Sequence, residues 1–290
     1  MRILITGANG HLGIRLIASL ALNHEVVSVV RSESACEKIS GLNCETHIID
    51  YSDSGGLSAA AADCDRAVHL VGIIKKTGNN SYEQAHELSC EALVNAARTA
   101  GLKQIVALSI IGSNAASGNA CLASRGRSEN ILLAGDVPAT IIRVPMVLGE
   151  DDFASRSLTK KAKAGICFIF RASSLEQPIY AGDLVNAIAA VIARSPGNEI
   201  IELAGMESIT RRELIARAGT TLGNHPTVVS IPLFAGLFIG KMLEILLPSP
   251  PVTADMIEIL DHDDQLDAQP VARQLGIELT SLDQTLAKVI

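Results

Sequence analysis

The stretch that decides the fold is Thr6-Gly7-Ala8-Asn9-Gly10-His11-Leu12-Gly13, which directly follows an apolar run near the start of the chain. Glycines at this spacing, between a strand and a helix, let the backbone turn tightly and approach a pyrophosphate. The phosphate charge then meets the free amides of the helix N-terminus. Tight packing alone is the alternative explanation for three such glycines. We therefore predict a dinucleotide site whose first contacts are made by Gly7, Asn9, Gly10, His11, Leu12 and Gly13.

Short apolar runs alternate with helical spacing through the first half of the chain. Strands are predicted at Arg2–Thr6, Glu25–Val30, Glu45–Ile49, Arg66–Leu70, Gln104–Ser109 and Thr140–Arg143. Each run is rich in Val, Ile or Leu, as expected for strands that are buried on both faces of a parallel sheet. Residues 82–100 have helical spacing and are followed by Gly101, where a C-cap glycine belongs. This alternation predicts an α/β fold with a Rossmann-type doubly wound parallel sheet.

The regular alternation loosens after about residue 150. Asp183–Ala193 still has the pattern of an apolar helix, and Pro178-Ile179-Tyr180 that of a short strand. We see no long linker and no internal repeat. We predict a cofactor-binding Rossmann core over residues 1–150 and a smaller C-terminal α+β lobe over residues 151–290. That lobe would contact a substrate or partner and return some strands to the core sheet.

Composition excludes several classes of protein. The chain has 290 residues, 24 of them Lys or Arg and 31 Asp or Glu, for a formal charge of −7. With 48% apolar residues, it is not a disordered chain. An acidic protein without basic runs interleaved with aromatic residues is not expected to bind nucleic acid.

The cysteines and histidines are dispersed along the sequence. None of the six cysteines forms a Cys-x-x-Cys pair, and no histidine spacing typical of a zinc site occurs, so we predict no metal. The first residues enter a strand without the features of a signal peptide. We expect a cytoplasmic protein with reduced thiols, with peripheral association with the inner membrane as the alternative.

The end of the second predicted strand indicates which dinucleotide fits. An NAD site usually has Asp or Glu there, for the ribose hydroxyls, whereas this chain has Arg31 and Ser32. A guanidinium fits a 2′-phosphate, and the serine hydroxyl adds a further hydrogen bond. We therefore predict NADP(H), with NAD(H) as the alternative cofactor and a solvated Arg31 as the alternative reading. Asp50 and Tyr51, after the third strand, are predicted to border the adenine.

Residues 226–247 are the most apolar part of the second half. They carry no charge from Pro226 to Gly240, but Pro232, Lys241 and Glu244 interrupt the stretch. A spanning helix needs about 20 apolar residues, so we predict no transmembrane segment. The stretch is interpreted as a helix that lines a hydrophobic pocket or interface. Peripheral contact with a membrane or an apolar protein partner is the alternative.

Several further motifs resemble the short-chain dehydrogenase/reductase superfamily. They are the glycine loop, His69-Leu70-Val71-Gly72, Leu108-Ser109, Arg143-Val144-Pro145 and Gln177-Pro178-Ile179-Tyr180-Ala181-Gly182-Asp183-Leu184. The likeness is to the extended and atypical, epimerase/dehydratase-like members and covers nearly the whole chain. Residues 68–74 and 250–255 are similar to the branch that contains the Rossmann-fold accessory subunit of respiratory complex I and its bacterial relatives. The resemblance implies cofactor contacts from Leu70, Val71, Gly72 and Pro145.

Active members of this superfamily use a Tyr-x-x-x-Lys pair, in which the Lys lowers the pKa of the Tyr and the Tyr exchanges a proton with the substrate. That pattern falls here on Cys121 and Arg125. Arg125 can still hold the ribose hydroxyls, but a cysteine is too short to replace the phenol. Loss of the proton shuttle is one reading. A substitute acid, such as Ser109, His86 or a group of the substrate, is the other.

The sequence is compatible with two functions. The first is an NADP-dependent oxidoreductase or epimerase that acts on a small or lipid-like molecule through the degenerate positions Ser109, Cys121 and Arg125. The second is a non-catalytic, nucleotide-bound accessory or sensor protein of a respiratory or membrane-associated assembly, in which the dinucleotide stabilises the fold.

Overall fold

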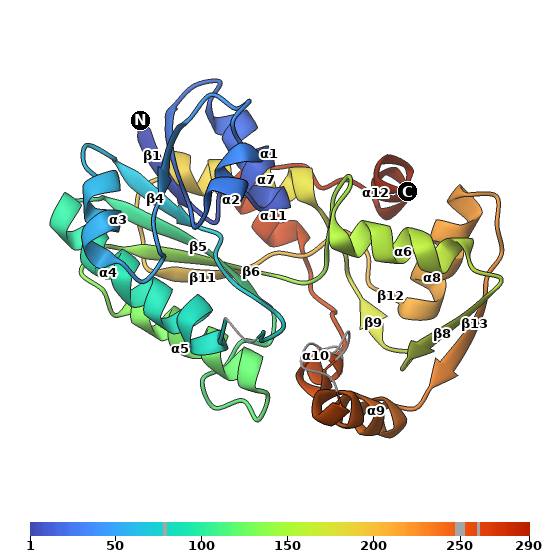
Figure 1. Ribbon diagram of the computed structural model, residues 1–290. Coiled ribbons are helices and arrows are strands. Elements are labelled where there is room, and N and C mark those ends of the chain that lie inside the picture. Colours follow the sequence, from blue (N-terminus) through green and yellow to red (C-terminus); the bar gives the residue numbers. More distant parts are fainter. Residues whose placement is uncertain (78–79, 247–252, 260–261) are drawn as a thin grey trace. The chain divides into compact units, whose positions relative to one another are not determined.

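The computed structural model describes residues 1–77, 80–246, 253–259 and 262–290 (Figure 1). The chain divides into two compact units. The first comprises Met1–Lys76, Asn80–Arg143 and Val185–Ile201, and the second chiefly Val144–Leu184 and Glu202–Ile290.

The first unit contains a seven-stranded sheet. Its strands are β1 (Arg2–Thr6), β2 (Glu25–Val30), β3 (Glu45–Ile48), β4 (Arg66–His69), β5 (Gln104–Ile110), β6 (Ala139–Val144) and β11 (Glu199–Glu202). They are arranged in the order β11-β6-β5-β4-β1-β2-β3. β1 pairs in parallel with β2 and β4, β2 with β3, and β4 with β5. The predicted doubly wound α/β fold is confirmed, because the chain runs outward from β1 to β3 and then crosses to β4.

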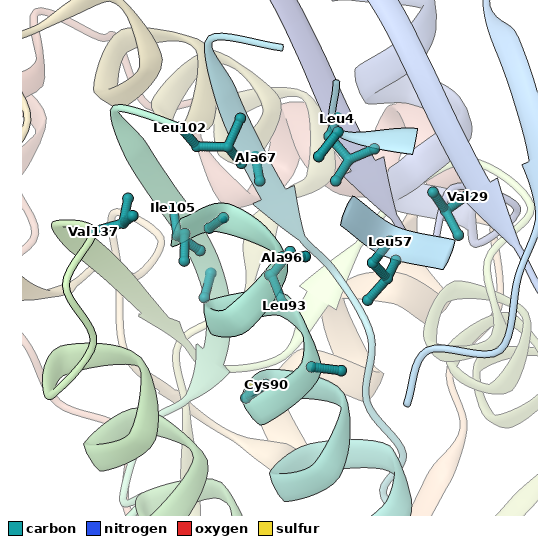
Figure 2. Packing of buried hydrophobic residues seen from close by; sticks show 14 of the residues in the cluster. Leu4, Val29, Leu57, Ala67, Cys90, Leu93, Ala96, Leu102, Ile105 and Val137 are labelled. Atoms are coloured by element: carbon teal, nitrogen blue, oxygen red, sulfur yellow. The ribbon is translucent and has the colours of Figure 1, made fainter. Parts of the chain in front are cut away.

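Helices cover both faces of this sheet. They are α1 (His11–Leu20), α2 (Glu33–Glu37), α3 (Ser54–Ala60), the π-helical η1 (Glu83–Leu88), α4 (Ser89–Ala100), α5 (Ala120–Leu133) and α7 (Ala181–Ala193), of which the part from Val185 onward belongs to this unit. α3, α4 and α5 lie on one face, and α1 and α7 on the other (Figure 1). Between α4 and the sheet, Leu93 and Ala96 pack toward Ala67 and Ile105 (Figure 2). α4 ends at Gly101, which has the predicted left-handed conformation, with φ of 71°.

The second unit is built from short strand pairs and helices. Its strands are β7 (Val147–Leu148), β8 (Ile166–Phe170), β9 (Leu175–Glu176), β10 (Ile179–Tyr180), β12 (Ile209–Thr210) and β13 (Thr227–Ile231). β7 pairs with β10 and β8 with β13 in parallel, while β9 and β12 are antiparallel. Its helices are α6 (Phe153–Lys163), α8 (Arg211–Thr221), α9 (Leu233–Leu246), α10 (Ala254–Ile259), α11 (Gln269–Leu275) and α12 (Leu282–Val289).

The interpretation of residues 226–247 as one helix is wrong. Thr227–Ile231 forms strand β13, and helix α9 begins only after Pro232. The β-branched run Thr227-Val228-Val229 pairs with β8, and Pro232, which lacks a backbone N–H, ends the ladder. Leu247 lies outside the described residues. Within the described part of the chain, none of the helices has both the length and the apolar character needed to cross a bilayer.

The polar residues of the Gln177–Leu184 motif hold the C-terminal segment of the second unit. The Gln177 side chain donates to the carbonyls of Gly205 and Leu266, each at 2.8 Å, and accepts from the Leu266 amide. The buried carboxylate of Asp183 accepts from the Thr280 amide at 2.7 Å and from its hydroxyl at 2.8 Å. This motif therefore has a structural role within the second unit.

Candidate functional site

The loops at the carboxyl ends of β1, β2, β3 and β4 line a groove that encloses about 260 Å³. Its walls are formed by Gly7, Asn9, Gly10, Arg31, Ser32, Ala35, Tyr51, Leu70, Val71, Gly72, Ile73, Asn80 and Ala85. The groove lies where the strand order reverses, since β1 has β2 on one side and β4 on the other. In open α/β sheets, this switch point is where ligands bind.

The glycines of the first loop make room for close backbone packing. Gly7 has φ of +76°, and a Cβ there would lie 3.0 Å from the carbonyl carbon of Leu70. A Cβ on Gly13 would lie 2.5 Å from the carbonyl oxygen of Ala8, which would push α1 away from the loop. The two glycines therefore let β1, α1 and the loop after β4 meet with only backbone between them.

The N-terminus of α1 opens toward this loop without a side-chain cap. Gly10 is the N-cap residue, its amide donates to the Gly7 carbonyl at 3.1 Å, and no acidic residue lies in the first turn. The first amides of a helix have no intrahelical acceptor, and together with the helix dipole they favour an anion. The amides of His11, Leu12 and Gly13 are therefore placed to hold a phosphate group.

Tyr51 joins the glycine loop to the end of β2. Its hydroxyl accepts from the Gly7 amide at 3.2 Å and donates to the Val29 carbonyl at 3.3 Å. Burial raises the pKa of the Tyr51 phenol, so the hydroxyl keeps the proton that this second bond needs. The guanidinium carbon of Arg31 lies 5.4 Å from the centre of the Tyr51 ring. This cation–π contact holds an exposed positive charge at the groove.

Ser32 and Asp50 have local structural partners as well. Ser32 caps α2 by accepting from the Ala35 amide at 3.3 Å, and it remains exposed in the groove wall. Asp50 is exposed but is not among the lining residues. Hydrogen bonds from the Ser52 hydroxyl and amide hold the pKa of the Asp50 carboxyl below its usual value. Asp50 thus fixes the turn after β3 beside Tyr51.

Two buried histidines support the inner wall. His69, the last residue of β4, forms a 2.7 Å hydrogen bond between its Nδ1 and the hydroxyl of Thr6, the last residue of β1. His86 Nε2 lies 3.1 Å from the Ile73 amide nitrogen. Burial, and next the positive charge of Arg125, lowers the pKa of both His69 and His86 to about 3. Both imidazoles are therefore neutral near physiological pH.

Arg125 connects the loop that follows β4 to strand β5. Its Nη1 donates to the carbonyls of Val71 and Leu108, each at 3.3 Å. Its Nη2 lies where a Cβ on Gly72 would stand, so only glycine leaves room for the guanidinium. Burial lowers the pKa of Arg125 from that of a solvated arginine. The predicted ribose-binding residue therefore has backbone partners of its own.

The other two residues predicted for catalysis face the protein interior. Cys121 is 0% exposed, and its Sγ lies 3.6 Å from the Ile73 carbonyl oxygen. The Ser109 hydroxyl donates to Glu129 Oε1 at 2.5 Å, and Glu129 forms a buried two-point ion pair with Arg143. Ser109 is thus part of a structural polar network.

The structure brings together only part of the predicted site. The predicted residues that line the groove are Gly7, Asn9, Gly10, Arg31, Ser32, Tyr51, Leu70, Val71 and Gly72. Pro145 belongs to the second unit, and its contact with cofactor stays a prediction. Sequence reasoning did not single out Ala35, Ile73, Asn80 or Ala85, which also line the groove. No sequence motif marks these four residues, because the tertiary fold and not a local pattern brings them to the groove.

Known proteins share this sequence pattern and fold. The chain is 25% identical over 232 residues to a ceramide reductase of Caulobacter vibrioides, covering 79% of this chain and 73% of the relative. It is 24% identical over 278 residues to mitochondrial NADH dehydrogenase [ubiquinone] 1 alpha subcomplex subunit 9 of Arabidopsis thaliana, covering 89% and 69%. The second match confirms the resemblance to the complex I accessory-subunit branch.

A solved structure shows the same architecture. The NADPH-dependent quinone oxidoreductase QOR2 of Escherichia coli, in complex with NADPH, superposes with a TM-score of 0.76 at 19% identity, covering 98% of both chains. At this identity the likeness establishes the fold alone. The sequence model of the NAD(P)H-binding family matches residues 7–165, which begin at the first loop glycine and extend beyond β6. Together with the groove at the switch point, this match shows that the chain belongs to the NAD(P)H-binding family.

Proposed function

We propose that this protein binds NADP(H) in preference to NAD(H) and uses it as an oxidoreductase. The observation that carries the proposal is the Arg31 guanidinium, held over the Tyr51 ring at the groove wall where NAD-binding relatives of this fold place an acid. A guanidinium forms strong, charge-assisted hydrogen bonds with a phosphate group. The exposed Ser32 hydroxyl lies in the same wall.

The remainder of the groove fits a dinucleotide. The uncapped start of α1 would hold the pyrophosphate, and Gly7 and Gly13 leave the space that backbone contact with it requires. Leu70, Val71 and Gly72, at the end of β4, would line the path toward the nicotinamide end. NADP(H), when bound, supplies or accepts a hydride at its nicotinamide ring.

The degenerate catalytic positions restrict the class of substrate. Cys121 is fully buried and the Ser109 hydroxyl is engaged by Glu129, so neither reaches solvent as an acid. Reduction of an ordinary ketone needs a proton donor for the developing alkoxide. A quinone-like acceptor needs none, because its reduced form is a stabilised anion that takes its proton from water. We therefore favour quinone-like acceptors, including lipid-like ones, over simple ketones and sugar nucleotides.

A second candidate function is a nucleotide-bound accessory protein without turnover. The observation that favours it is Arg125, whose Nη1 bonds to the Val71 and Leu108 carbonyls tie the groove wall together. A nucleotide bound beside this wall would stabilise the first unit by mass action on the native state. The relative from Arabidopsis is named as a subunit of a larger assembly.

One set of measurements tests the cofactor and the function. Purified wild-type protein and Arg31→Asp are titrated with NADPH and NADH by fluorescence. We expect Arg31→Asp to weaken NADPH binding by about tenfold to a hundredfold, the value of a charge-assisted hydrogen bond, and NADH binding far less. Lys38→Asp, an exposed charge reversal at the far end of α2, is the matched control and should change neither affinity. Equal losses for both cofactors would refute the 2′-phosphate assignment.

The role of the nucleotide is then read from exchange and oxidation. Bound NADPH is chased with excess NADP⁺, and a water-soluble short-chain quinone is added in parallel. Rapid release together with quinone-dependent oxidation supports the oxidoreductase. Release over many minutes without oxidation supports the accessory function, because an oxidoreductase must exchange its cofactor in every turnover.

A further inference from the structure

The second unit exposes an unusually large share of its aromatic residues. All five phenylalanines of the chain lie between residues 153 and 238, and none is in the buried core. Phe168, Phe234 and Phe238 are 65%, 76% and 68% exposed. Large contiguous apolar patches are rare on monomeric proteins and mark interaction surfaces.

Helix α9 presents one apolar face outward. Its exposed large residues are Phe234, Phe238, Met242 and Leu246, which recur every four residues and form what we call the apolar stripe. Because residues four apart share one face of a helix, they lie in a single row along α9. The exposed Lys241 is close to this row on the helical wheel.

The opposite face of α9 is held against the second unit by two glycines. A Cβ on Gly236 would lie 2.7 Å from the Phe170 ring, and a Cβ on Gly240 would lie 2.9 Å from the backbone nitrogen of Ala254. Both glycines are buried. The orientation of α9 is therefore fixed by close packing, and the stripe is the face that this packing leaves outside.

The strand pair β8–β13 extends the apolar surface. In the parallel register, Val229 lies beside Phe168, and Ile166 is on the same face of β8 two residues earlier. All three are exposed, whereas Cys167, between them on the other face, is buried. Phe170, next in the same row, packs its ring on Gly236 of α9. α9 therefore packs at the end of this outward row and turns the stripe away from it, so the stripe and the outward face of β8–β13 are exposed on the same side of the strand pair.

Two exposed lysines, Lys163 and Lys241, border this surface, whereas the chain as a whole is acidic. Lys163 is the last residue of α6, the helix that leads into β8 and packs on its buried face through Leu158 and Ala162. β8 and β13 carry no charge, and α9 carries Lys241 and Glu244. The outward face of the strand pair is therefore uncharged, within a protein of net charge −7. Only Ala164 and Gly165 separate Lys163 from Ile166, so a lysine borders the surface at that end as well.

Two further acids belong to the helix that packs behind α9. Asp255 and Glu258 are in α10, and α10 packs on the face that contains Gly240. They are thus placed behind the stripe. A surface of exposed Phe, Ile, Met and Leu side chains bordered by lysines matches an anionic lipid bilayer, where apolar side chains enter the acyl boundary and ammonium groups stay among the headgroups.

We propose that the apolar stripe of α9, together with Ile166, Phe168 and Val229, binds the surface of an anionic phospholipid membrane. A second copy of the chain suits this surface less well. A two-fold contact would bring Lys163 and Lys241 of each copy toward the same residues of the other, and like charges that meet across an interface oppose association. The proposal concerns the second unit and is independent of the cofactor assigned to the first.

Vesicle co-sedimentation of the full chain tests the proposal. The vesicles contain either an equimolar mixture of phosphatidylglycerol and phosphatidylcholine or phosphatidylcholine alone. Wild-type protein should bind the anionic vesicles more tightly, and added salt should weaken binding. The double variant F234S/F238S should bind roughly a hundredfold more weakly, since two phenylalanines that would enter the bilayer are lost. K163E/K241E should lose more than about tenfold on anionic vesicles.

Matched control variants in the first unit test whether vesicle binding is specific to this surface or is a nonspecific effect of exposed apolar and basic residues. Leu22→Ser removes an apolar side chain that is 80% exposed, and Lys38→Glu reverses an exposed lysine. Both should bind vesicles like the wild type, and unchanged thermal unfolding shows that every variant is folded. The proposal is overturned by equal binding to neutral and anionic vesicles, or by unimpaired binding of F234S/F238S. It is also overturned if the wild type is a dimer that binds no vesicles and becomes monomeric in F234S/F238S.

Discussion

The buried hydrogen bond between His69 and Thr6 makes the first unit sensitive to acid. It joins the ends of β1 and β4, from which the two central loops of the groove depart. Burial lowers the pKa of His69 to about 3, whereas an unfolded histidine has a pKa of about 6.5. Between these values the unfolded chain binds more protons than the folded one. The free energy of unfolding therefore falls as pH drops through the unfolded-state pKa.

The size of the effect follows from the two pKa values. At about pH 5 the unfolded imidazole is almost fully charged and the folded one neutral, which costs about 2 kcal/mol relative to about pH 7. This difference of about 2 kcal/mol hardly depends on how far the pKa of folded His69 lies below 5. Between about pH 7 and about pH 5, nearly all of the proton uptake occurs in the unfolded state. His86, whose pKa is also lowered to about 3, adds a similar amount.

Urea unfolding at the two pH values measures this difference directly. In His69→Asn, which keeps a polar group near the Thr6 hydroxyl but has no titrating ring, the change between about pH 7 and about pH 5 should shrink by about 2 kcal/mol. His225→Asn, at an exposed position, is the matched control for the loss of one imidazole. If His69→Asn keeps the full wild-type change, then His69 is not a neutral buried group and the reasoning fails.

Two further predictions concern the packing around the groove. Glu129→Gln leaves Arg143 without its buried carboxylate partner and should lower the free energy of unfolding by about 3 kcal/mol in urea titrations; a loss below about 1 kcal/mol would contradict a buried pair. Gly13→Ala places a Cβ 2.5 Å from the Ala8 carbonyl oxygen and should weaken NADPH binding by at least about tenfold in a fluorescence titration. Gly41→Ala, where a Cβ meets open space, should bind NADPH normally.

The fold could be predicted well because its signals are local. Arg2–Thr6 and Glu25–Val30 are strands with the predicted bounds, since buried parallel strands leave short runs of Val, Ile and Leu. The exception is Thr227–Ile231, which lies inside a long uncharged stretch. Hydropathy alone does not distinguish a strand from a helix there. The β-branched residues before Pro232 were the signal that distinguishes them.

The candidate site could be predicted only for residues that directly follow predicted strands. The glycine loop comes directly after β1, and Arg31 comes directly after β2. Because these two strands are parallel neighbours, both segments lie in the same groove. The bridge from Tyr51 to Gly7 and Val29 joins residues far apart in sequence, and no local pattern marks it. The same holds for Ser109, whose hydroxyl is taken by Glu129 across 20 positions.

One face of α5 carries Cys121 and Arg125, the positions on which the Tyr-x-x-x-Lys pattern falls. The sequence alone shows that the tyrosine and lysine are missing, but not what the residues in their place contact. Cys121, Arg125 and Glu129 follow one another at four-residue spacing, so they share one face of the helix. Cys121 and Arg125 contact backbone carbonyls after β4 and within β5, and Glu129 accepts a hydrogen bond from Ser109. The contacts of Cys121 with Ile73 and of Arg125 with Val71 hold residues that line the groove. In active members of the superfamily that the sequence resembles, this face supplies a proton. Here its side chains bind backbone carbonyls and Ser109, which supports the proposal of acceptors that need no acid.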